Sequence, residues 1–367
     1  MQFTVSQETI ARSLQLVCSI VERRATLPIL STILLRAHGK QLSMTSTDME
    51  LEMIATLPVD VEQEGKTTVS ARKFLDICRA LPSNAMISFK AQDNKAIVRT
   101  GKSRFSLSTL PSEDFPESEG ANYIDEISLS QTALKSLLDE TSFAMASQDV
   151  RYYLNGLLLE REDKLLRAVA TDGHRLALGS IETNNAVEQK NNIIIPRKAI
   201  MELGRLLNEG DDTVTIAFSS QQIKVELPDL HFTSKLIDGQ FPNYERVLPL
   251  GGDKIVIADR EQLKQALSRA SILSNDKHRS VRINLESGLL KATVTNQEQE
   301  SAEEEITVDY SGSALEIAFN NSYLLDLLNA IPDDKVKMVF SDDNSSVLIT
   351  PADEKLDRQY VVMPMRL

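Results

Sequence analysis

FSLSTLPSEDFP (Phe105–Pro116), FTSKLIDGQFPNY (Phe232–Tyr244) and YVVMPMRL (Tyr360–Leu367) are three versions of one strand-like segment, and they recur about every 125 residues. A repeat of about 20–50 residues indicates stacked supersecondary units, whereas a repeat above about 100 residues has the size of a domain. The 367-residue chain is therefore predicted to contain three copies of one domain. Three copies in register favour an arc, and an arc suggests that something is encircled.

Two helical segments recur with the same spacing. One is VSARKFLDICRALP from Val69, IIPRKAIMELGRLL from Ile194 and AFNNSYLLDLLNAI from Ala318, and the other is TVSQETIARSL from Thr4, SLSQTALKSLL from Ser128 and ADREQLKQALSRA from Ala258. Their apolar periodicity predicts helices over residues 6–24, 72–81, 130–143, 196–207, 259–270 and 320–331.

Short β-branched or alternating runs fill the space between these helices. A strand is expected before the first helix of each repeat, at Phe3–Val5, Ile127–Leu129 and Ile255–Ile257. Further strands such as ILSTILLRA and QLSMTST follow, separated by short polar turns. Two helices beside many antiparallel strands predict an α+β unit with its helices on one face of the sheets.

The least patterned polar segments, Pro116–Asp125 and Leu248–Asp253, are the expected linkers between repeats. They divide the chain into three domains, 1–122, 123–249 and 250–367. The polar run Glu182–Asn192 lies inside a repeat and is expected to be a loop.

Charge is distributed unevenly along the chain. The net charge is −13, which by itself argues against nucleic acid. The six expected helices carry a net +4, however, and the remainder carries −17. Basic helices on an acidic body favour a positive lining inside a negative rim; the alternative is that Lys and Arg simply favour helices.

The motifs ATDGHRLAL (Ala170–Leu178) and VVMPMRL (Val361–Leu367) resemble those of a known family, the bacterial DNA polymerase III beta subunit, which is the replication sliding clamp. Four further segments agree with it: TLPILSTILL from Thr26, RFSLSTLP from Arg104, QDVRYYLNG from Gln148 and FPNYERVLP from Phe241. The resemblance runs in order from the first residues to the last and includes the three repeats.

The resemblance implies a homodimeric ring made of two three-domain arcs, with helices lining the hole and sheets outside. Such a ring encircles duplex DNA without sequence preference, slides along it and tethers the replicative polymerase. Other implied partners are the clamp loader, further DNA polymerases and repair factors, which carry short peptide motifs. No cofactor or metal is implied, and the location is cytoplasmic.

By the same resemblance, DNA contact falls on a small set of residues: Arg24, Arg72, Gln148, Tyr152 and Tyr153. Arginine pairs with phosphate, and tyrosine offers a ring and a hydroxyl to tilted or single-stranded DNA. Arg72 and Arg197 begin helices, where a cation opposes the helix dipole, so a functional reason for their placement is expected. The third repeat departs, with Asn320-Asn321-Ser322 at this position.

The resemblance also implies a groove for partner peptides. Its expected residues are Leu154, Thr171, Gly173, His174, Arg175, Leu176, Pro242, Arg246, Val247, Val361, Met363, Pro364, Met365, Arg366 and Leu367. Methionine and leucine side chains at a chain end provide adaptable apolar surface for a short extended peptide. The alternative is that the terminal segment is only the last core strand, and both hold if alternate residues face opposite ways.

Ring closure requires complementary ends. The expected interface pairs a basic end with an acidic end that has two apolar neighbours, and its residues are Lys73, Lys102, Arg104, Phe105, Ile272, Leu273, Glu298, Glu300, Glu303 and Glu304. The alternative for the glutamate run is a solvated surface.

Other classes of function have weaker support. Asp172 and His174 lie close together, but one carboxylate and one imidazole do not bind a metal, and no phosphate loop or nucleophile motif accompanies them. The two cysteines, Cys18 and Cys78, lie on apolar stripes and are expected to be buried and reduced. A triplicated scaffold that binds proteins but not DNA is the remaining alternative.

Overall fold

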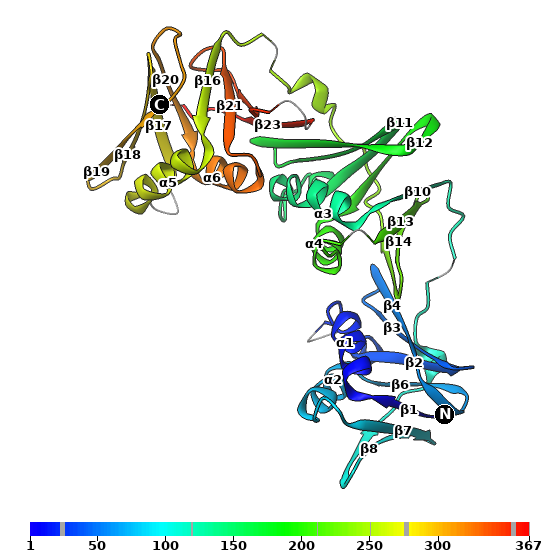
Figure 1. Cartoon of the computed structure of the whole chain (residues 1–367). Helices are drawn as coiled ribbons and strands as arrows, with labels where there is room; N and C mark the ends of the chain where they lie inside the picture. The colour runs from blue at the N-terminus through cyan, green and yellow to red at the C-terminus, as the bar shows by residue number, and fades with distance from the viewer. Residues whose placement is uncertain are drawn as a thin grey trace. The chain divides into compact units, whose positions relative to one another are not determined.

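The computed structural model describes residues 1–22, 26–118, 120–210, 212–249, 251–274, 279–353 and 357–366, without the side chains of residues 188 and 189. Figure 1 labels the helices and strands of the whole chain, which divides into two compact units. The first unit comprises Met1–Gln131 and Arg205–Leu236, and the second comprises Thr132–Gly204 and Ile237–Leu367.

The described residues contain six α-helices, two in each repeat: α1 (Gln7–Val17), α2 (Ala71–Ala80), α3 (Gln131–Asp139), α4 (Arg197–Leu206), α5 (Arg260–Ala270) and α6 (Asn321–Ala330). Polar side chains begin three of them, since Ser6, Asp259 and Asn320 each accept a hydrogen bond from a backbone N–H of the first turn. No helix in these ranges is long and apolar enough to cross a membrane.

The expected end of the first helix is wrong. The prediction ran to residue 24, but α1 ends at Val17 with Cys18 as its C-cap. The chain then tightens into a turn, with the Ser19 N–H donating to the Leu16 carbonyl at 3.0 Å. Ile20 and Val21 are still buried, so the apolar period continues through a turn and imitates a longer helix. The third helix likewise ends at Asp139 and is followed by a 3₁₀ turn.

The first unit contains two antiparallel sheets. The five-stranded sheet has the order β5 (Asp60–Gln63), β1 (Gln2–Ser6), β7 (Met86–Gln92), β8 (Lys95–Thr100), β9 (Ser103–Ser108). The eight-stranded sheet has the order β10 (Asp125–Ser130), β13 (Thr213–Phe218), β14 (Gln222–Leu227), β15 (Leu230–Lys235), β4 (Leu51–Pro58), β3 (Gln41–Thr47), β2 (Thr32–His38), β6 (Gly65–Ser70).

The second unit also contains two antiparallel sheets. The six-stranded sheet has the order β11 (Gly156–Thr171), β12 (Arg175–Pro196), β23 (Arg358–Val362), β22 (Val347–Pro351), β21 (Lys335–Phe340), β16 (Lys254–Asp259). The four-stranded sheet has the order β19 (Ser301–Thr307), β18 (Leu289–Thr295), β17 (Ser280–Glu286), β20 (Leu315–Asn320). The segment Glu182–Asn192, expected to be a loop, lies within β12, so that expectation is wrong.

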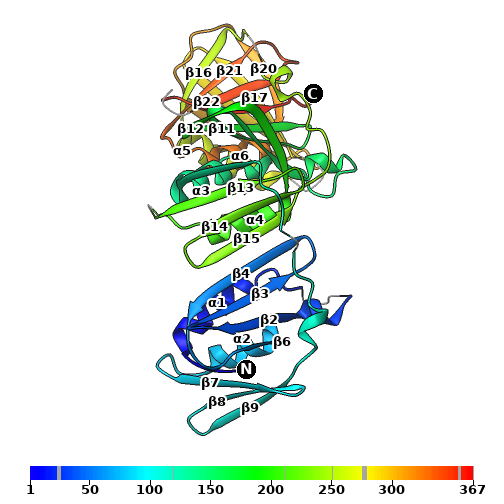
Figure 2. The same cartoon turned by 90° about the vertical axis from the view of Figure 1, so that its right-hand side faces the viewer.

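Within each unit, the last strand of one repeat pairs with a hairpin of the preceding repeat. In the first unit β15 pairs with β4, with Thr233 opposite Glu52 (Figure 2). In the second unit β23 pairs with β12, with Val361 opposite Leu176. These pairings join neighbouring repeats into continuous sheets.

Equivalent backbone hydrogen bonds show that the repeats share one fold. The first residue of α1, α3 and α5 donates its N–H to a carbonyl that follows the second helix of the same repeat. These bonds are Gln7 to Ala85 (2.9 Å), Gln131 to Asp212 (2.9 Å) and Arg260 to Asp334 (2.8 Å). The α+β class and the three clamp-like domains are therefore as the sequence predicts.

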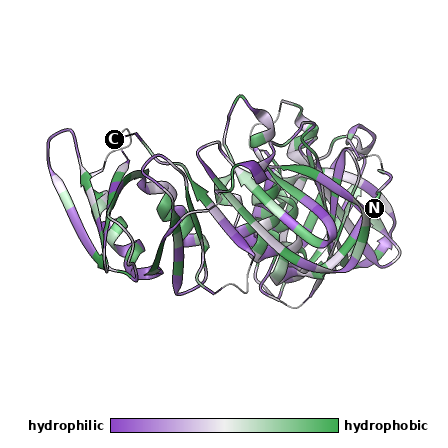
Figure 3. Ribbon diagram, turned by 90° about the horizontal axis from the view of Figure 1, so that it is seen from above, coloured by the Kyte–Doolittle hydropathy of each residue, from purple (hydrophilic) through white to green (hydrophobic). Residues whose placement is uncertain are grey.

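The core lies between the helices and the sheets. Hydrophilic and hydrophobic segments alternate in colour along strands in Figure 3. In β17 every second residue is buried. Cys18 and Cys78 are both buried and free, as expected. Burial raises the pKa of each thiol to about 12, which keeps both protonated and unreactive.

Candidate functional site

A groove of about 200 Å³ in the second unit collects most of the residues that the sequence assigned to a peptide site. Its lining is Arg151, Leu154, Thr171, Gly173, His174, Arg175, Leu176, Pro242, Val247, Val361 and Met363. The residues come from the segment before β11, the turn between β11 and β12 with the adjoining strand ends, the end of β23, and the segment that leads into the third repeat.

The turn between β11 and β12 is held by its own side chains. The Asp172 carboxylate accepts the backbone N–H groups of His174 and Arg175 at 2.9 and 3.0 Å. The Thr171 hydroxyl donates to the Arg175 carbonyl at 2.6 Å and accepts the Gly173 N–H at 3.1 Å. Both side chains therefore stabilise the tight turn that forms one wall of the groove.

Gly173 is required at the tip of this turn. Its φ of +88° lies in the left-handed region that L side chains disfavour. A Cβ atom there would also lie 2.8 Å from an Nη atom of Arg151. The guanidinium of Arg151 therefore occupies the space that the glycine leaves open.

Arg151 is a groove residue that the sequence prediction missed. Its guanidinium binds the Asp149 carboxylate at 2.8 and 3.0 Å and the Asp172 carbonyl at 3.0 Å. The hydrogen bonds that Asp149 accepts from the guanidinium and from the backbone N–H of Arg151 lower the pKa of Asp149 to about 2. The residue stands inside the motif QDVRYYLNG, so its position in a recognised segment was the one signal that could have identified it.

Arg175 fixes the groove to α6. Its guanidinium donates to Asp326 at 2.6 Å and to Asp172 at 3.1 Å. It also lies 4.4 Å from the centre of the Tyr323 ring. With its side chain only 11% exposed, Arg175 holds the wall in place, and less of it is available to a ligand than the sequence suggested.

The chain end contributes less to the groove than the sequence predicts. Val361 is buried in the floor, and Met363, 39% exposed, lies at the rim. The Met363 N–H donates to the His174 carbonyl at 2.9 Å, whereas the Met365 N–H donates to Ala318 of β20 at 2.7 Å. Pro364, Met365, Arg366 and Arg246 do not line the described groove, and Leu367 lies outside the described residues.

The opposite wall, Pro242 and Val247, depends on a buried tyrosine. Tyr244, in a short 3₁₀ turn, is 6% exposed and packs in the apolar cluster with Leu176 and Val361. Its hydroxyl donates to the Glu160 carboxylate at 2.8 Å. Burial is the main reason that the pKa of Tyr244 is raised, so the phenol stays a hydrogen-bond donor.

Three family profiles match consecutive parts of the chain, namely the N-terminal, central and C-terminal domains of the DNA polymerase III beta subunit. The matches cover residues 1–119, 128–243 and 245–366. The chain belongs to the DNA polymerase III beta subunit family.

Curated relatives agree over the full length. The chain is 50% identical to the beta sliding clamp of Pseudomonas aeruginosa and 48% identical to that of Escherichia coli, with all of each chain covered. A crystal structure of the Pseudomonas aeruginosa beta subunit has a TM-score of 0.98 at 50% identity, and a Caulobacter crescentus clamp has 0.95 at 38%, again over both whole chains. The family inferred from the sequence motifs is confirmed.

The DNA-contact residues expected for this family lie in both units. Arg72 is exposed in the first turn of α2, as is Lys73 beside it. In the second unit Gln148 is exposed, with φ +58°, and Tyr152 is 55% exposed with its ring 5.7 Å from that of Tyr153. Arg24 lies outside the described residues.

Among the described residues, the first residues of α4 and α6 make contacts that Arg72 in α2 does not make. Arg197 donates to the Met145 carbonyl at 2.9 Å, so its guanidinium is partly committed to the fold. In α6 the basic pair is replaced by Asn320, which caps the helix, and by buried Asn321, which donates to the Leu267 carbonyl at 3.0 Å. The third repeat thus uses this position for helix packing.

Most of the residues expected at a clamp interface lie on or beside two sheet edges, whereas Lys73 is in α2 and Ile272 and Leu273 are in a 3₁₀ turn. Lys102, Arg104 and Phe105 are on or beside β9, an edge of the five-stranded sheet, and the glutamates are on or before β19, an edge of the four-stranded sheet. Glu304 is already paired with Arg269 of α5 at 2.6 Å. Ile272, next to Leu273, is 77% exposed.

His174, the histidine that the sequence analysis weighed for a metal or catalytic site, lies beside α6. Its ring lies 6.5 Å from that of Tyr323, and the described residues contain no group of three or more His, Cys, Asp or Glu that would hold a metal. His174 is a wall of the groove.

The geometry of the turn leads to a test of Gly173. The substitution Gly173→Ala should lower the free energy of unfolding by about 1 kcal/mol for the left-handed backbone. It should cost about 1 kcal/mol more because Arg151 is displaced from its hydrogen bonds. Gly39→Ala is the matched control, since Gly39 has φ +60° and open space around it. Equal losses in urea denaturation of the two variants would contradict the role given to Arg151.

Proposed function

We propose that two copies of this chain close head to tail into a ring that encircles duplex DNA, slides along it and tethers the replicative polymerase. The ring is cytoplasmic and has no catalytic site of its own. Each chain of the ring has three domains, 1–122, 123–249 and 250–367. Clamp loader, polymerases and repair factors bind it through short peptides.

The observation that carries this proposal is that two junctions between repeats are formed by strand pairing, whereas the two strands that would form a third junction lie at sheet edges. The last strands β15 and β23 each pair with the hairpin of a preceding repeat. The last strand of the first repeat is β9, and the corresponding hairpin strand of the third repeat is β19. Each of these two strands lies at an edge of its sheet. If β9 of each chain pairs with β19 of the other, two chains form this contact twice between them and close a ring.

The register of the two existing junctions predicts the register of the third. In each hairpin the first strand ends in a threonine, and the residue paired with it on the second strand marks the position of the junction. These residues are Glu52, Leu176 and Ser301. On the incoming strands the matching residues are Thr233, Val361 and, by the repeat, Ser106. Ser106 of one chain is therefore expected opposite Ser301 of the other.

This register places opposite charges face to face. Two residues along, Arg104 stands opposite Glu303, and Lys102 stands opposite Glu305. Lys102 and Arg104 are exposed, and Glu303 is paired at 2.7 Å only with Lys291 of the neighbouring strand among the described residues. Glu304 points to the other face, toward Arg269, where Phe105, Ile272 and Leu273 supply apolar area.

DNA contact is proposed from the exposed cations and rings. Arg72 has no ion-pair partner within the described ranges, and a cation in a first helical turn weakens the helix. A sliding contact needs only sequence-independent attraction to phosphates, which a few such groups provide. The exposed ring of Tyr152 and the partly buried ring of Tyr153 would stack on bases or sugars beside them.

Partner peptides are proposed to bind in the groove of the second unit. The floor formed by Leu176 and Val361 is apolar, and Met363 and Val247 at its rim are partly exposed. An extended peptide with aliphatic anchors would cover this surface. A solved Pseudomonas aeruginosa clamp, 50% identical, is bound to griselimycin, so a ligand is known on this fold.

A charge exchange tests the register of the dimer. Arg104→Glu should weaken the dimer by about 0.4–2 kcal/mol over two junctions, since like charges would then face each other. Adding Glu303→Arg should restore it, and adding Glu304→Arg should not. Sedimentation equilibrium measures the association. Equal rescue by both second substitutions would contradict the register.

A topological assay tests DNA encirclement and the role of Arg72. Clamps loaded by the clamp loader should stay on circular plasmid and slide off linear plasmid. Arg72→Gln should lower the salt slope of log affinity by about 0.9 without lowering helix stability. Lys40→Gln, which changes an exposed lysine of a turn, is the control. Equal loss from circular and linear DNA would reject the ring.

Methionine substitutions test the groove. Met363→Ala should weaken binding of a fluorescent peptide with aliphatic anchors by about 1 kcal/mol, because apolar contact is lost. Met201→Ala, at an equally exposed methionine of α4, should leave the affinity unchanged. The same affinity in both variants, measured by anisotropy, would place the peptide elsewhere.

A further inference from the structure

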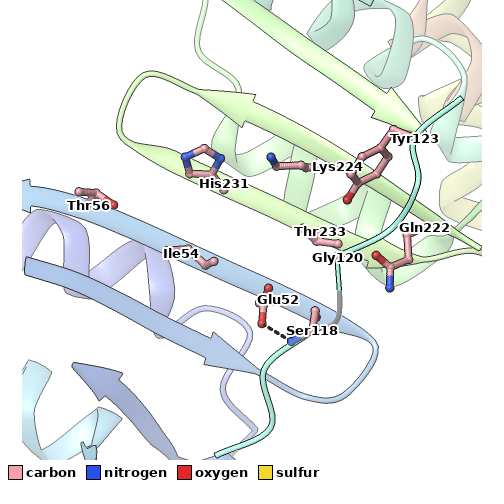
Figure 4. Close-up of a pocket in the computed structure, with 10 residues that line it drawn as sticks. All are labelled: Glu52, Ile54, Thr56, Ser118, Gly120, Tyr123, Gln222, Lys224, His231 and Thr233. Carbon is pink, nitrogen blue, oxygen red and sulfur yellow. Dashed lines mark hydrogen bonds between the residues drawn. The ribbon is translucent and has the colours of Figure 1, made fainter. Parts of the chain in front are cut away.

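A second cavity, of about 380 Å³, lies in the first unit at the junction of β4 and β15 (Figure 4). Its lining comes from three places: β4, the neighbouring strands β14 and β15, and the polar segment after the first repeat. The lining residues are Glu52, Ile54, Thr56, Ser118, Gly120, Tyr123, Gln222, Lys224, His231 and Thr233.

The strand register makes this cavity the counterpart of the groove in the second unit. Glu52 pairs with Thr47 and Thr233, as Leu176 pairs with Thr171 and Val361. One strand further on, Lys224 pairs with Thr233 as Leu348 pairs with Val361. The two cavities therefore share these register positions. From there the first-unit cavity continues along β4 to Ile54 and Thr56, whereas the groove of the second unit continues to the turn at Gly173.

The segments that border the two cavities are also anchored in the same way. Phe115-Pro116-Glu117 corresponds to Phe241-Pro242-Asn243 in sequence. Glu117 is bound by Arg36 at 3.0 Å, and Tyr244, one residue beyond Asn243, is bound by Glu160 at 2.8 Å. Arg36 and Glu160 hold the same position in the strand that follows each first helix.

The chemistry of the two floors is opposite. Leu176, Val361 and Leu348 form or border an apolar floor in the second unit. Their counterparts Glu52, Thr233 and Lys224 carry a carboxylate, a hydroxyl and an ammonium group. A cavity with these groups disfavours the aliphatic anchors that suit the apolar groove, since its polar groups would lose water without gaining partners.

Glu52 is the distinctive group. It is 8% exposed, and its Oε2 accepts the Ser118 N–H at 3.0 Å, the bond drawn in Figure 4. Within the described residues its Oε1 has no hydrogen-bond partner. A carboxylate so deeply buried is stabilised when a cation with several donors pairs with it.

The two basic side chains that line the cavity already contact a carboxylate that is not part of its lining. The Lys224 ammonium contacts the Glu226 carboxylate, and His231 Nδ1 lies 3.4 Å from the same carboxylate. Glu226 therefore neutralises that end of the cavity, and Glu52 keeps acceptor capacity at the other end. Tyr123 and Gln222 line the same cavity and offer a ring face and an amide oxygen.

We propose that this cavity is a second partner site, which receives the guanidinium of an arginine in a short extended peptide segment of a partner protein. The planar guanidinium fits the free side of the Glu52 carboxylate. This inference goes beyond the proposed function, and it stands whether or not the apolar groove binds peptides. The two sites would then select different anchors, aliphatic in one and basic in the other.

Methyl NMR of the full-length protein tests this site, with the Ile54 methyl as reporter. The probe acetyl-Gly-Arg-Gly-amide should shift the Ile54 signal. Its neutral citrulline analogue and acetyl-Gly-Glu-Gly-amide should not. Glu52→Gln keeps the acceptor for Ser118 but removes the charge, so the arginine probe should bind at least about tenfold more weakly. Glu50→Gln, an exposed neighbour, is the matched control and should bind normally.

A second variant distinguishes the loss of probe binding from a loss of folding. Glu52→Leu copies the floor of the apolar groove, so the protein should keep its dispersed methyl spectrum while losing the response to the arginine probe. The proposal is overturned if the citrulline or glutamate probe shifts Ile54 as strongly as the arginine probe. It is also overturned if Glu52→Gln binds normally, or if no probe shifts Ile54.

Discussion

Antiparallel pairing between the last strand of one repeat and the hairpin of the preceding repeat is the constraint on which the structure depends. Backbone N–H and C=O groups at a sheet edge need partners. β15 provides them for β4, and β23 provides them for β12. Because both pairings use the same register, each junction presents the same residue positions on the same face. The corresponding edges in the first and third repeats, β9 and β19, have the same geometry and therefore a predicted partner.

One geometry with different side chains explains how repeats that share a fold can differ in function. At the second-unit junction the positions of Leu176 and Val361 hold apolar residues and give an apolar groove. At the first-unit junction the same positions hold Glu52 and Thr233 and give a polar cavity. The backbone sets where a cavity forms, and only the side chains decide what it would accept.

The repeat and the apolar periodicity were sufficient to predict the α+β class, the six helices and the strand that opens each repeat. They failed where a turn imitates a helix, as at Ile20 and Val21, and where a polar run continues a strand, as within β12. Both failures arise because burial period and polarity describe which residues face the core, whereas hydrogen bonding decides the backbone conformation.

Most groove residues were predicted from family motifs, but the contacts that hold them were not. Arg151 reaches Asp149 and Gly173 across a turn, and Tyr244 reaches Glu160 across many residues of sequence. Such pairs depend on tertiary contact, and no local pattern marks them. The sequence prediction also grouped Glu303 with Glu304, although alternation along the strand places them on opposite faces, with Glu304 toward Arg269.

Disulfide trapping measures the central claim most directly. Ser106→Cys and Ser301→Cys in one chain, under mild oxidation, should give a covalent dimer joined at both junctions, since the register places these residues opposite each other. The native thiols at Cys18 and Cys78 are buried and should not interfere. Efficient trapping of Ser106→Cys with Glu303→Cys instead, or no trapping of either pair, would show that the edges do not meet in the register of the other two junctions.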